Sequence, residues 1–362
     1  MVSVSGEKAV TSPAVHRLLR LECQGPQMPP RKNRSHLAIA GAGVAGAYLY
    51  RLLSRDKIRT DVYDVRHKTR CGVSPCAWAT SEGFIGLIEA SGLDPGKYIF
   101  QQIDHVTVGE MKVKVEVMTI DKPNLVKDLL QGTEIRYSPL DLKNYDRVID
   151  ATGFSRTFLP PIKKDIISSC IQYCVQKNKP IEDRIELGGI GYAWCLHLSE
   201  NRYHIGCGSL AEKPLKVLKD LGWIEIYNLN PGRNILCGCT GEIRVTGPRE
   251  SQPFVTNGTA DGIWGVGEAI GCVGSVVGDG IVPGMRSAQI LMDNWDNPDG
   301  YRKSILKKFR WIDDERRLID KFVKKKPLNV GDALIIKHTS KRIGMNIGIA
   351  QAAIFIKRLK LS

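Results

Sequence analysis

The clearest alternation of apolar and polar segments begins near residue 36. A short apolar run at 37–40 predicts a buried strand, a glycine-rich segment at 41–46 predicts a turn, and 47–53 has the spacing of a helix. A second strand is expected over 60–65. This strand, turn, helix and strand form a βαβ unit, which predicts an α/β fold with a parallel sheet.

Further strands follow in two groups. An apolar run at 147–150 leads into a glycine turn, and 262–267 gives another buried strand before a glycine-rich loop and a helix beginning near Pro283. Residues 112–117 alternate as an exposed strand does, and 156–260 are rich in strands broken by glycine and asparagine turns. These patterns predict a Rossmann-like domain, an antiparallel-sheet substrate domain and a helical C-terminal region.

The expected domain organisation is discontinuous along the chain. The first residues carry Ser, Pro and Gln without a sustained period, and Met28 is an alternative start. The predicted divisions are a flexible arm at 1–34, a dinucleotide-binding domain at 35–100, 140–160 and 260–300, a substrate domain at 101–139 and 161–259, and a basic helical region at 301–362.

Charge changes this picture in the last third of the chain. The net charge is +14, and lysine and arginine are dense after residue 300. Such a surface favours anionic partners, among them acidic lipid headgroups, although a solvated basic face explains it equally well. No run approaches the roughly 20 apolar residues of a membrane-spanning helix. We therefore expect a cytoplasmic protein that can bind peripherally to the inner face of the cell membrane.

The cysteines predict reduced thiols. Their spacing contains no paired CxxC pattern, and no secretory signal precedes them. Two local pairs, Cys170 with Cys174 and Cys237 with Cys239, are weaker candidates for a metal site, so the expected metal content is none. The ten positions are Cys23, Cys71, Cys76, Cys170, Cys174, Cys195, Cys207, Cys237, Cys239 and Cys272.

The glycine-rich turn has the chemistry of a dinucleotide site. Gly41 permits a tight turn, Gly43 lets the backbone approach a pyrophosphate, and Gly46 lets the helix pack closely on the strand. The helix start, with Val44 and Ala45, directs free N–H groups and a positive dipole end at the phosphates. Asp64 closes the next strand and can accept hydrogen bonds from a ribose.

Three later segments favour FAD over NAD(P). Residues 150–153, with Asp150 and Gly153, resemble the ATG turn of two-dinucleotide flavoproteins. Residues 267–271 and 278–281 resemble their GDAAG and GxGI segments, whose acid contacts the ribityl chain. Residues 70–76 resemble the CGG loop that approaches the flavin ring. The residues this resemblance implies in cofactor binding are Gly41, Gly43, Val44, Ala45, Gly46, Asp64, Cys71, Gly72, Asp150, Gly153, Gly267, Glu268, Gly271, Gly278, Gly280 and Ile281.

In this order the segments resemble the geranylgeranyl reductase family of FAD-dependent oxidoreductases, over roughly residues 36–300. The most specific piece is 191–197, which resembles the YxWxFP motif that lines the isoprenoid cavity. Tyr192 and Trp194 lie on one face because side chains alternate along a strand. The chain departs from the family pattern with Leu196 and His197 for Phe-Pro, Glu268 for Asp and Ser275 for proline.

The resemblance implies reduction of C=C double bonds in geranylgeranyl chains of archaeal membrane lipids or their precursors. Cys71, Tyr192 and Trp194 are then the expected catalytic residues, with His197 a weaker candidate for proton donation. The expected partners are an isoprenoid lipid, an anionic membrane surface, and either reduced ferredoxin or NAD(P)H as electron donor. The alternatives are a monooxygenase or halogenase of the same fold and, outside the enzymes, a basic nucleic-acid-binding protein; we expect no nucleic acid.

Overall fold

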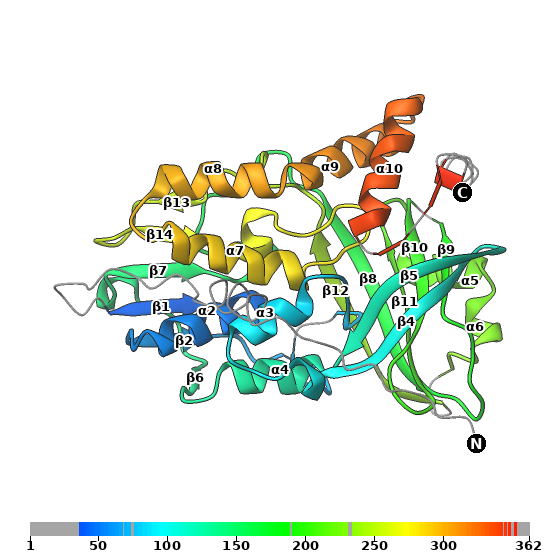
Figure 1. Cartoon of the computed structure of the whole chain (residues 1–362), viewed down its shortest axis with the longest axis horizontal. Coiled ribbons are helices and arrows are strands. Elements are labelled where there is room, and N and C mark those ends of the chain that lie inside the picture. Colours follow the sequence, from blue (N-terminus) through cyan, green and yellow to red (C-terminus); the bar gives the residue numbers. More distant parts are fainter. Residues whose placement is uncertain are drawn as a thin grey trace, which may run out of the picture.

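The computed structural model describes most of the chain from residue 36 onward. The described residues are 36–67, 69–73, 76–188, 190–230, 234–342, 344–345, 347–348 and 351–352. The expected arm at 1–34 and the basic residues after 352 lie outside the described residues. Two sheets side by side, with helices around them, make up the body of the molecule (Figure 1).

The first sheet is the predicted dinucleotide-binding sheet. Its central strand β1 is fully apolar and buried, and pairs in parallel with β2 and β7, so the predicted βαβ unit is confirmed. Only β13 runs antiparallel to its neighbour among the described pairs of this sheet. The strand order is β13 (Val255–Thr256), β14 (Ile263–Gly265), β7 (Arg147–Asp150), β1 (Leu37–Ala40), β2 (Thr60–Tyr63) and β6 (Ile135–Arg136).

Helices pack on this sheet through one large apolar core. Helix α2 begins at Val44, one turn earlier than predicted, because Gly43 in extended conformation ends the preceding turn. Helix α7 begins at Ile281, two residues before Pro283, where the Asp279 carboxylate accepts a 3.0 Å hydrogen bond from the Ile281 N–H. The helices of this half are α2 (Val44–Arg55), α3 (Phe84–Ala90), α4 (Lys122–Leu129), α7 (Ile281–Asp293) and α8 (Pro298–Lys308).

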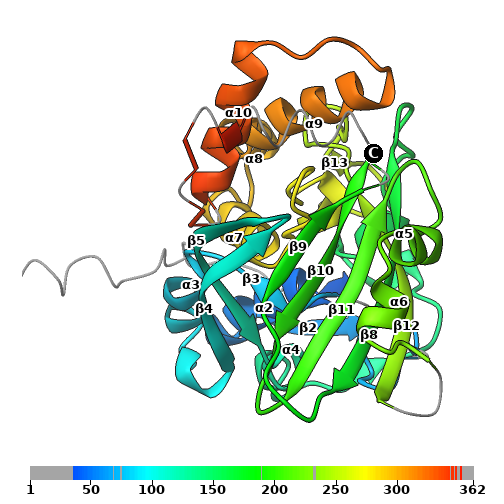
Figure 2. The same cartoon turned by 90° about the vertical axis from the view of Figure 1, so that its right-hand side faces the viewer.

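The second sheet has eight strands and curves beside the first (Figure 2). The predicted antiparallel arrangement holds except between β4 and β9, which run parallel with Thr107 opposite Arg184. The strand order is β12 (Ile235–Arg244), β8 (Ile167–Gln176), β11 (Arg202–Ser209), β10 (Gly191–His197), β9 (Arg184–Leu187), β4 (Ile99–Val108), β5 (Met111–Ile120) and β3 (Ala79–Thr80).

Different elements cover the two faces of the second sheet. One face packs Cys195 and Tyr203 against Trp223, under the short helices α5 (Pro214–Asp220) and α6 (Trp223–Ile226). The opposite face carries Trp194 and packs against Ala333 of α10 (Val330–Arg342). Four 3-10 turns complete the described elements: η1 (Pro95–Lys97), η2 (Leu142–Asn144), η3 (Gly153–Ser155) and η4 (Gly267–Ile270).

The C-terminal region is helical, as predicted. Helix α9 (Arg310–Val323) follows α8, and α10 folds back toward the second sheet, tied to α9 by a 2.7 Å ion pair between Lys321 and Asp332. None of the described helices is long and apolar enough to cross a membrane.

The domain boundaries differ from those expected. Helix α4 and strand β6 fall within 101–139 yet belong with the first sheet, as does β13, whereas β3 joins the second sheet. The chain crosses between the two sheets more often than the pattern of apolar residues indicated, because two- and three-residue strands leave almost no periodicity.

Candidate functional site

The site begins where three parallel strands end side by side. Ala40 of β1, Asp150 of β7 and Gly265 of β14 are neighbours in register, and each strand runs into a glycine turn. A Cβ on Gly41 would overlap the carbonyl oxygen of Ala151, and one on Gly46 would overlap the carbonyl oxygen of Gly41. These two glycines are therefore required by backbone packing at the strand ends.

Gly43 differs from its two neighbours in the motif. Its φ of −67° is open to any residue, and a Cβ built on it would meet no atom within 4 Å. No side chain caps the N-terminus of α2 that follows. The bare backbone and the first N–H groups at Val44 and Ala45 therefore face open space. An anionic diphosphate fits there, because a helix N-terminus attracts negative charge and donates N–H groups.

Asp64 lies beside this turn, directly after β2. Its Oδ2 accepts a 3.1 Å hydrogen bond from the Ala42 N–H, and its Oδ1 accepts a 2.7 Å bond from the Val65 N–H. The His67 Nε2 lies 3.4 Å from Oδ2. The structure thus brings Asp64 to the glycine turn, at the position expected for a ribose-binding carboxylate.

The segment after β14 closes the site from the other side. Gly267 has a φ of +65°, and a Cβ there would come within 2.8 Å of the Ala45 Cβ; Gly284 of α7 also contacts Ala45. Glu268 Oε1 accepts a 2.7 Å hydrogen bond from the Arg244 N–H. Burial raises the pKa of the Glu268 carboxyl to about 6, against the opposing effect of Arg244. The segments at 41–46, 150–153 and 267–284 therefore meet.

Some residues expected to bind the cofactor make contacts within the protein. The Asp150 carboxylate is buried and accepts hydrogen bonds from Thr152 N–H and Oγ1 and from the N–H groups of Phe158 and Leu159. A Cβ on Gly271 would lie 2.5 Å from the Thr246 carbonyl oxygen. Asp150 therefore shapes the turn that holds Gly153, and Gly271 packs against protein, a correction to the direct contacts expected of both.

Two basic residues near Glu268 escaped the sequence analysis. Arg244 ends β12 and its buried guanidinium pairs with Asp165 at 2.9 Å and donates to the carbonyl oxygens of Gly153 and Glu268. Lys122, at the start of α4, is only 4% exposed and its charge acts on Glu268. Neither lies in a motif, so only the packing of distant segments reveals them.

The loop before α7 carries Gly278, Gly280 and the helix start at Ile281. Gly278 has a φ of +70°, and a Cβ there would lie 3.7 Å from the Tyr192 hydroxyl. Asp279 between the glycines accepts a 3.0 Å hydrogen bond from Ser81 Oγ as well as the bond from Ile281. The sequence analysis passed over Asp279, although its place before a helix is a recognisable capping signal.

Tyr192 and Trp194 share one face of β10, as predicted, with ring centroids 5.7 Å apart. The Tyr192 hydroxyl donates to the Val277 carbonyl oxygen, and the Trp194 Nε1–H donates to Gln172 Oε1 at 3.2 Å. Trp194 is 7% exposed and lies over Gly206 of β11, where a Cβ would come 2.5 Å from its ring. Much of its ring therefore contacts the sheet.

His197 lies on the other face of β10. Its ring stacks on Tyr203 at 4.8 Å between centroids, and its Nε2 is 2.6 Å from the Glu200 carbonyl oxygen. It is therefore a structural residue, and the weaker hypothesis of proton donation from His197 is wrong for the face that carries Tyr192.

The loop with Cys71 lies over the same face as Trp194. Gln172 connects them, since its Nε2–H donates to the Cys76 carbonyl oxygen at 2.9 Å. Cys71 Sγ lies 3.6 Å from Thr69 Oγ1, and Gly72 has a φ of +71° with no atom within 4 Å of a built Cβ. Residues 74 and 75 of the expected 70–76 segment lie outside the described residues.

The two cysteine pairs also gather on this face. Cys174 of β8 lies opposite Cys237 of β12, and Cys239 lies opposite Gln172. Burial raises the pKa of Cys170 to about 12 and of Cys174 and Cys239 to about 11, so these thiols are protonated at neutral pH. Among the described residues, no group of three or more acidic, histidine or cysteine side chains is arranged to hold a metal ion.

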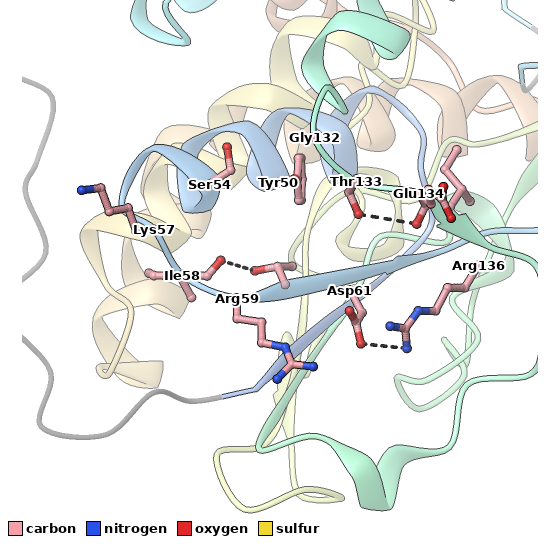
Figure 3. Close-up of a pocket in the computed structure, with 12 residues that line it drawn as sticks. Tyr50, Ser54, Lys57, Ile58, Arg59, Asp61, Gly132, Thr133, Glu134 and Arg136 are labelled. Carbon is pink, nitrogen blue, oxygen red and sulfur yellow. Dashed lines mark hydrogen bonds and ion pairs between the residues drawn. The ribbon is translucent and has the colours of Figure 1, made fainter.

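A separate cavity of about 540 Å³ lies at the amino end of β2, away from Asp64 (Figure 3). Its wall joins the C-terminal half of α2 to residues 132–136, and a 2.8 Å ion pair links Asp61 to Arg136. The glycine turns do not line it. This cavity is therefore distinct from the candidate site.

Comparison with known proteins agrees with the fold. No protein-family model matches the chain. An uncharacterized protein of Methanocaldococcus jannaschii is 23% identical over 353 residues, covering 79% of this chain and 92% of that protein. A geranylgeranyl bacteriochlorophyll reductase-like protein from Thermoplasma acidophilum superposes with a TM-score of 0.61 at 17% identity, over 90% of this chain and 99% of its own.

Two further solved structures bind or are assigned FAD. A Klebsiella pneumoniae HpxO variant complexed with FAD gives a TM-score of 0.57 at 12% identity, over 90% and 98% of the two chains. A probable FAD-dependent monooxygenase from Pseudomonas aeruginosa gives 0.54 at 14% identity, over 89% and 100%. The chain has the α/β fold shared by geranylgeranyl reductase-like proteins and FAD-dependent monooxygenases, in agreement with the family resemblance of its sequence.

Proposed function

We propose that the protein is an FAD-dependent oxidoreductase. The observation that carries the proposal is the contrast within the glycine motif. Backbone packing requires glycine at 41 and 46, whereas no atom of the described residues lies within 4 Å of a Cβ built at Gly43, so packing among them does not require a glycine there. A ligand that approaches the backbone closely would require a glycine at position 43. The uncapped N-terminus of α2 beside it suits a diphosphate.

The surrounding residues fit the rest of the cofactor. Asp64 at the end of β2 suits the ribose, and the turns at 150–153 and 267–271 follow neighbouring strands, from which they would contact a bound nucleotide. The N-terminus of α7 and Gly278 suit the flavin end. Bound FAD would supply the hydride chemistry, while the protein supplies position and shielding.

The proposed reaction is reduction of C=C double bonds in a geranylgeranyl chain. Tyr192 and Trp194 give an apolar face where the second sheet meets the loops at 69–73 and 274–278, and a prenyl chain suits such a surface. The protonated thiols of Cys170 and Cys174 add a lining with little polarity. The likeness to the Thermoplasma acidophilum reductase-like protein over nearly its whole length supports this reading.

A monooxygenase is the second candidate, because HpxO with FAD and the Pseudomonas aeruginosa monooxygenase share the fold. The two activities differ in what they do with oxygen and with the donor. A reductase needs a closed site and electrons from reduced ferredoxin or NAD(P)H, whereas a monooxygenase consumes oxygen and adds an oxygen atom to its substrate.

The test starts from the purified protein. Its absorption spectrum and the chromatography of flavin released by denaturation establish whether it carries FAD. The flavin is then reduced chemically without oxygen and mixed with a geranylgeranyl lipid or with its fully saturated counterpart. We expect reoxidation of the flavin by the unsaturated lipid alone, with a gain of two hydrogen atoms per double bond by mass spectrometry. A colourless protein would contradict FAD binding, and an oxygenated product formed with oxygen uptake would favour the monooxygenase.

A further inference from the structure

Residues 274–278, which precede α7, are held by a hydrogen bond within the segment and by contacts from two other parts of the molecule. The segment closes on itself through a 2.8 Å hydrogen bond from the Gly278 N–H to the Gly274 carbonyl oxygen. On the side of the second sheet, the Val277 carbonyl oxygen accepts the Tyr192 hydroxyl. On the side of α9, the Val276 N–H donates to Glu315 Oε2 at 2.9 Å. The segment thus lies between the candidate site and the C-terminal helices.

Glu315 is the unusual member of this arrangement. It is 0% exposed, and its Oε1 makes no hydrogen bond of normal geometry with any described residue. A buried carboxylate with one oxygen that lacks a hydrogen-bond donor is costly, so this side chain is poorly suited to carry a charge.

The groups that face Glu315 come from two sides. From the segment at 274–278 they are the N–H groups of Ser275 and Val276, and from α10 they are the Thr339 hydroxyl and the Arg342 guanidinium. Arg342 also stacks over the Trp311 ring, 4.9 Å from its centroid. Burial raises the pKa of Glu315 to about 7 despite these opposing groups. The carboxyl therefore changes charge near neutral pH.

We propose that Glu315 is a positioning residue for the segment at 274–278, holding it in place when protonated and loosening it together with α10 when ionised. The ionised carboxylate needs more hydrogen-bond donors than these groups provide, and water admitted between α9, α10 and the segment would supply them. The same α10 covers the face of the second sheet that carries Trp194. The flavin-facing role of this segment rests on the proposed function; its attachment to Glu315 does not.

Hydrogen exchange of the whole purified protein tests the proposal, at about pH 5 and about pH 7, between the ordinary glutamate pKa and the pKa of Glu315. After correction for intrinsic exchange, we expect protection of the amides at 276–278 and in α10 to fall with rising pH, by up to about tenfold per pH unit because one proton is involved. Glu315→Gln, which stays neutral, should keep its protection across this range. The control is Asp314→Asn, whose carboxylate pairs with Arg317 on the solvent side of α9 and should leave the wild-type behaviour intact.

A second variant covers the case in which Glu315→Gln does not fold. Arg342→Met removes the cation that lowers the Glu315 pKa, so the loss of protection should move to higher pH. Identical pH dependence in the wild type and in whichever of these variants folds would overturn the proposal, as would its loss in Asp314→Asn. A protein that shows the expected exchange but carries no FAD would contradict the proposed function and still support the role of Glu315.

Discussion

The two sheets of this protein build their parts of the candidate site in opposite ways. At the ends of β1, β7 and β14 the site is formed by backbone atoms, with glycines where strands and helices approach closely. On the second sheet the site is formed by two large side chains, Tyr192 and Trp194, each held by a single hydrogen bond to a distant segment. Bare backbone leaves a fixed spacing of glycines in the sequence, whereas the groups that hold Tyr192 and Trp194 lie in distant segments that no motif connects to them.

The largest expected effect separates binding from folding within the glycine motif. Gly43→Val should abolish FAD retention and leave the thermal unfolding of the flavin-free protein unchanged, because a Cβ built at residue 43 would meet no atom within 4 Å. Gly46→Ala should instead destabilise the fold itself by about 1–3 kcal/mol, because its Cβ would overlap the Gly41 carbonyl oxygen. Flavin content and calorimetry of both variants check this. A Gly43→Val protein that still carries flavin would contradict the assignment of residues 41–46 to dinucleotide binding.

Trp194 tests the other side of the comparison. Trp194→Ala should cost about 3–5 kcal/mol of unfolding free energy, because a nearly buried ring over Gly206 is lost and the Gln172 amide loses its partner. Trp194→Phe, which keeps most of the apolar contact, should cost clearly less. Urea denaturation measures both. If Trp194→Ala is as stable as the wild type and only turnover of a prenyl lipid falls, the ring lines a cavity instead of supporting the sheet.

Arg244 lies where the two regions meet. Arg244→Met should lower the unfolding free energy by about 3 kcal/mol, because it leaves Asp165 and the carbonyl oxygens of Gly153 and Glu268 without their donor. Arg249→Met is the matched control, since that arginine is 69% exposed. Equal stability of the two variants would show that the two sheets are held together without this residue.

A smaller effect should appear in the pH dependence of stability. The pKa of Glu315 is about 7 in the folded protein and 4.5 for an ordinary glutamate, so the folded state binds this proton more tightly. The resulting stability is fully present below about pH 4.5 and is lost as pH rises to about 7, by up to about 3 kcal/mol. The unfolding free energy of Glu315→Gln relative to the wild type should therefore increase over this range. A constant difference would mean that Glu315 titrates normally.

The smallest effect per residue concerns the exposed basic surface after α9. Replacing Lys324, Lys325 and Lys326 by glutamine should weaken binding to anionic vesicles by about 1 kcal/mol per lysine at low salt. Co-sedimentation with anionic and neutral vesicles measures this. Equal binding to both, or tighter binding to duplex RNA, would assign the charge to another partner.

The sequence predicted the first sheet better than the second for physical reasons. The glycine turn, Asp64 and the buried strand at 37–40 follow local rules of backbone geometry, and each lies where expected. Strand β3 of the second sheet carries only two residues, too few for a period, and the same holds for β6 at the edge of the first sheet. Contacts with segments far away in the chain determine the roles of Arg244, Lys122 and Glu315, and no local pattern shows them. Asp150 was assigned to the cofactor because a motif does not show which groups of the protein already donate hydrogen bonds to its carboxylate.

The position of β14 has a consequence for the order in which the protein is made. This strand pairs with β7, yet more than a hundred residues, among them five strands of the second sheet, separate the two in the chain. During synthesis, β1, β2 and β7 leave the ribosome long before Ile263. The edge of the first sheet at β7 is therefore unpaired while the second sheet forms. A nascent chain ending before residue 265 lacks the strand beside Asp150. Folding of the nucleotide half is therefore expected to finish after the second sheet, although it begins first in the sequence.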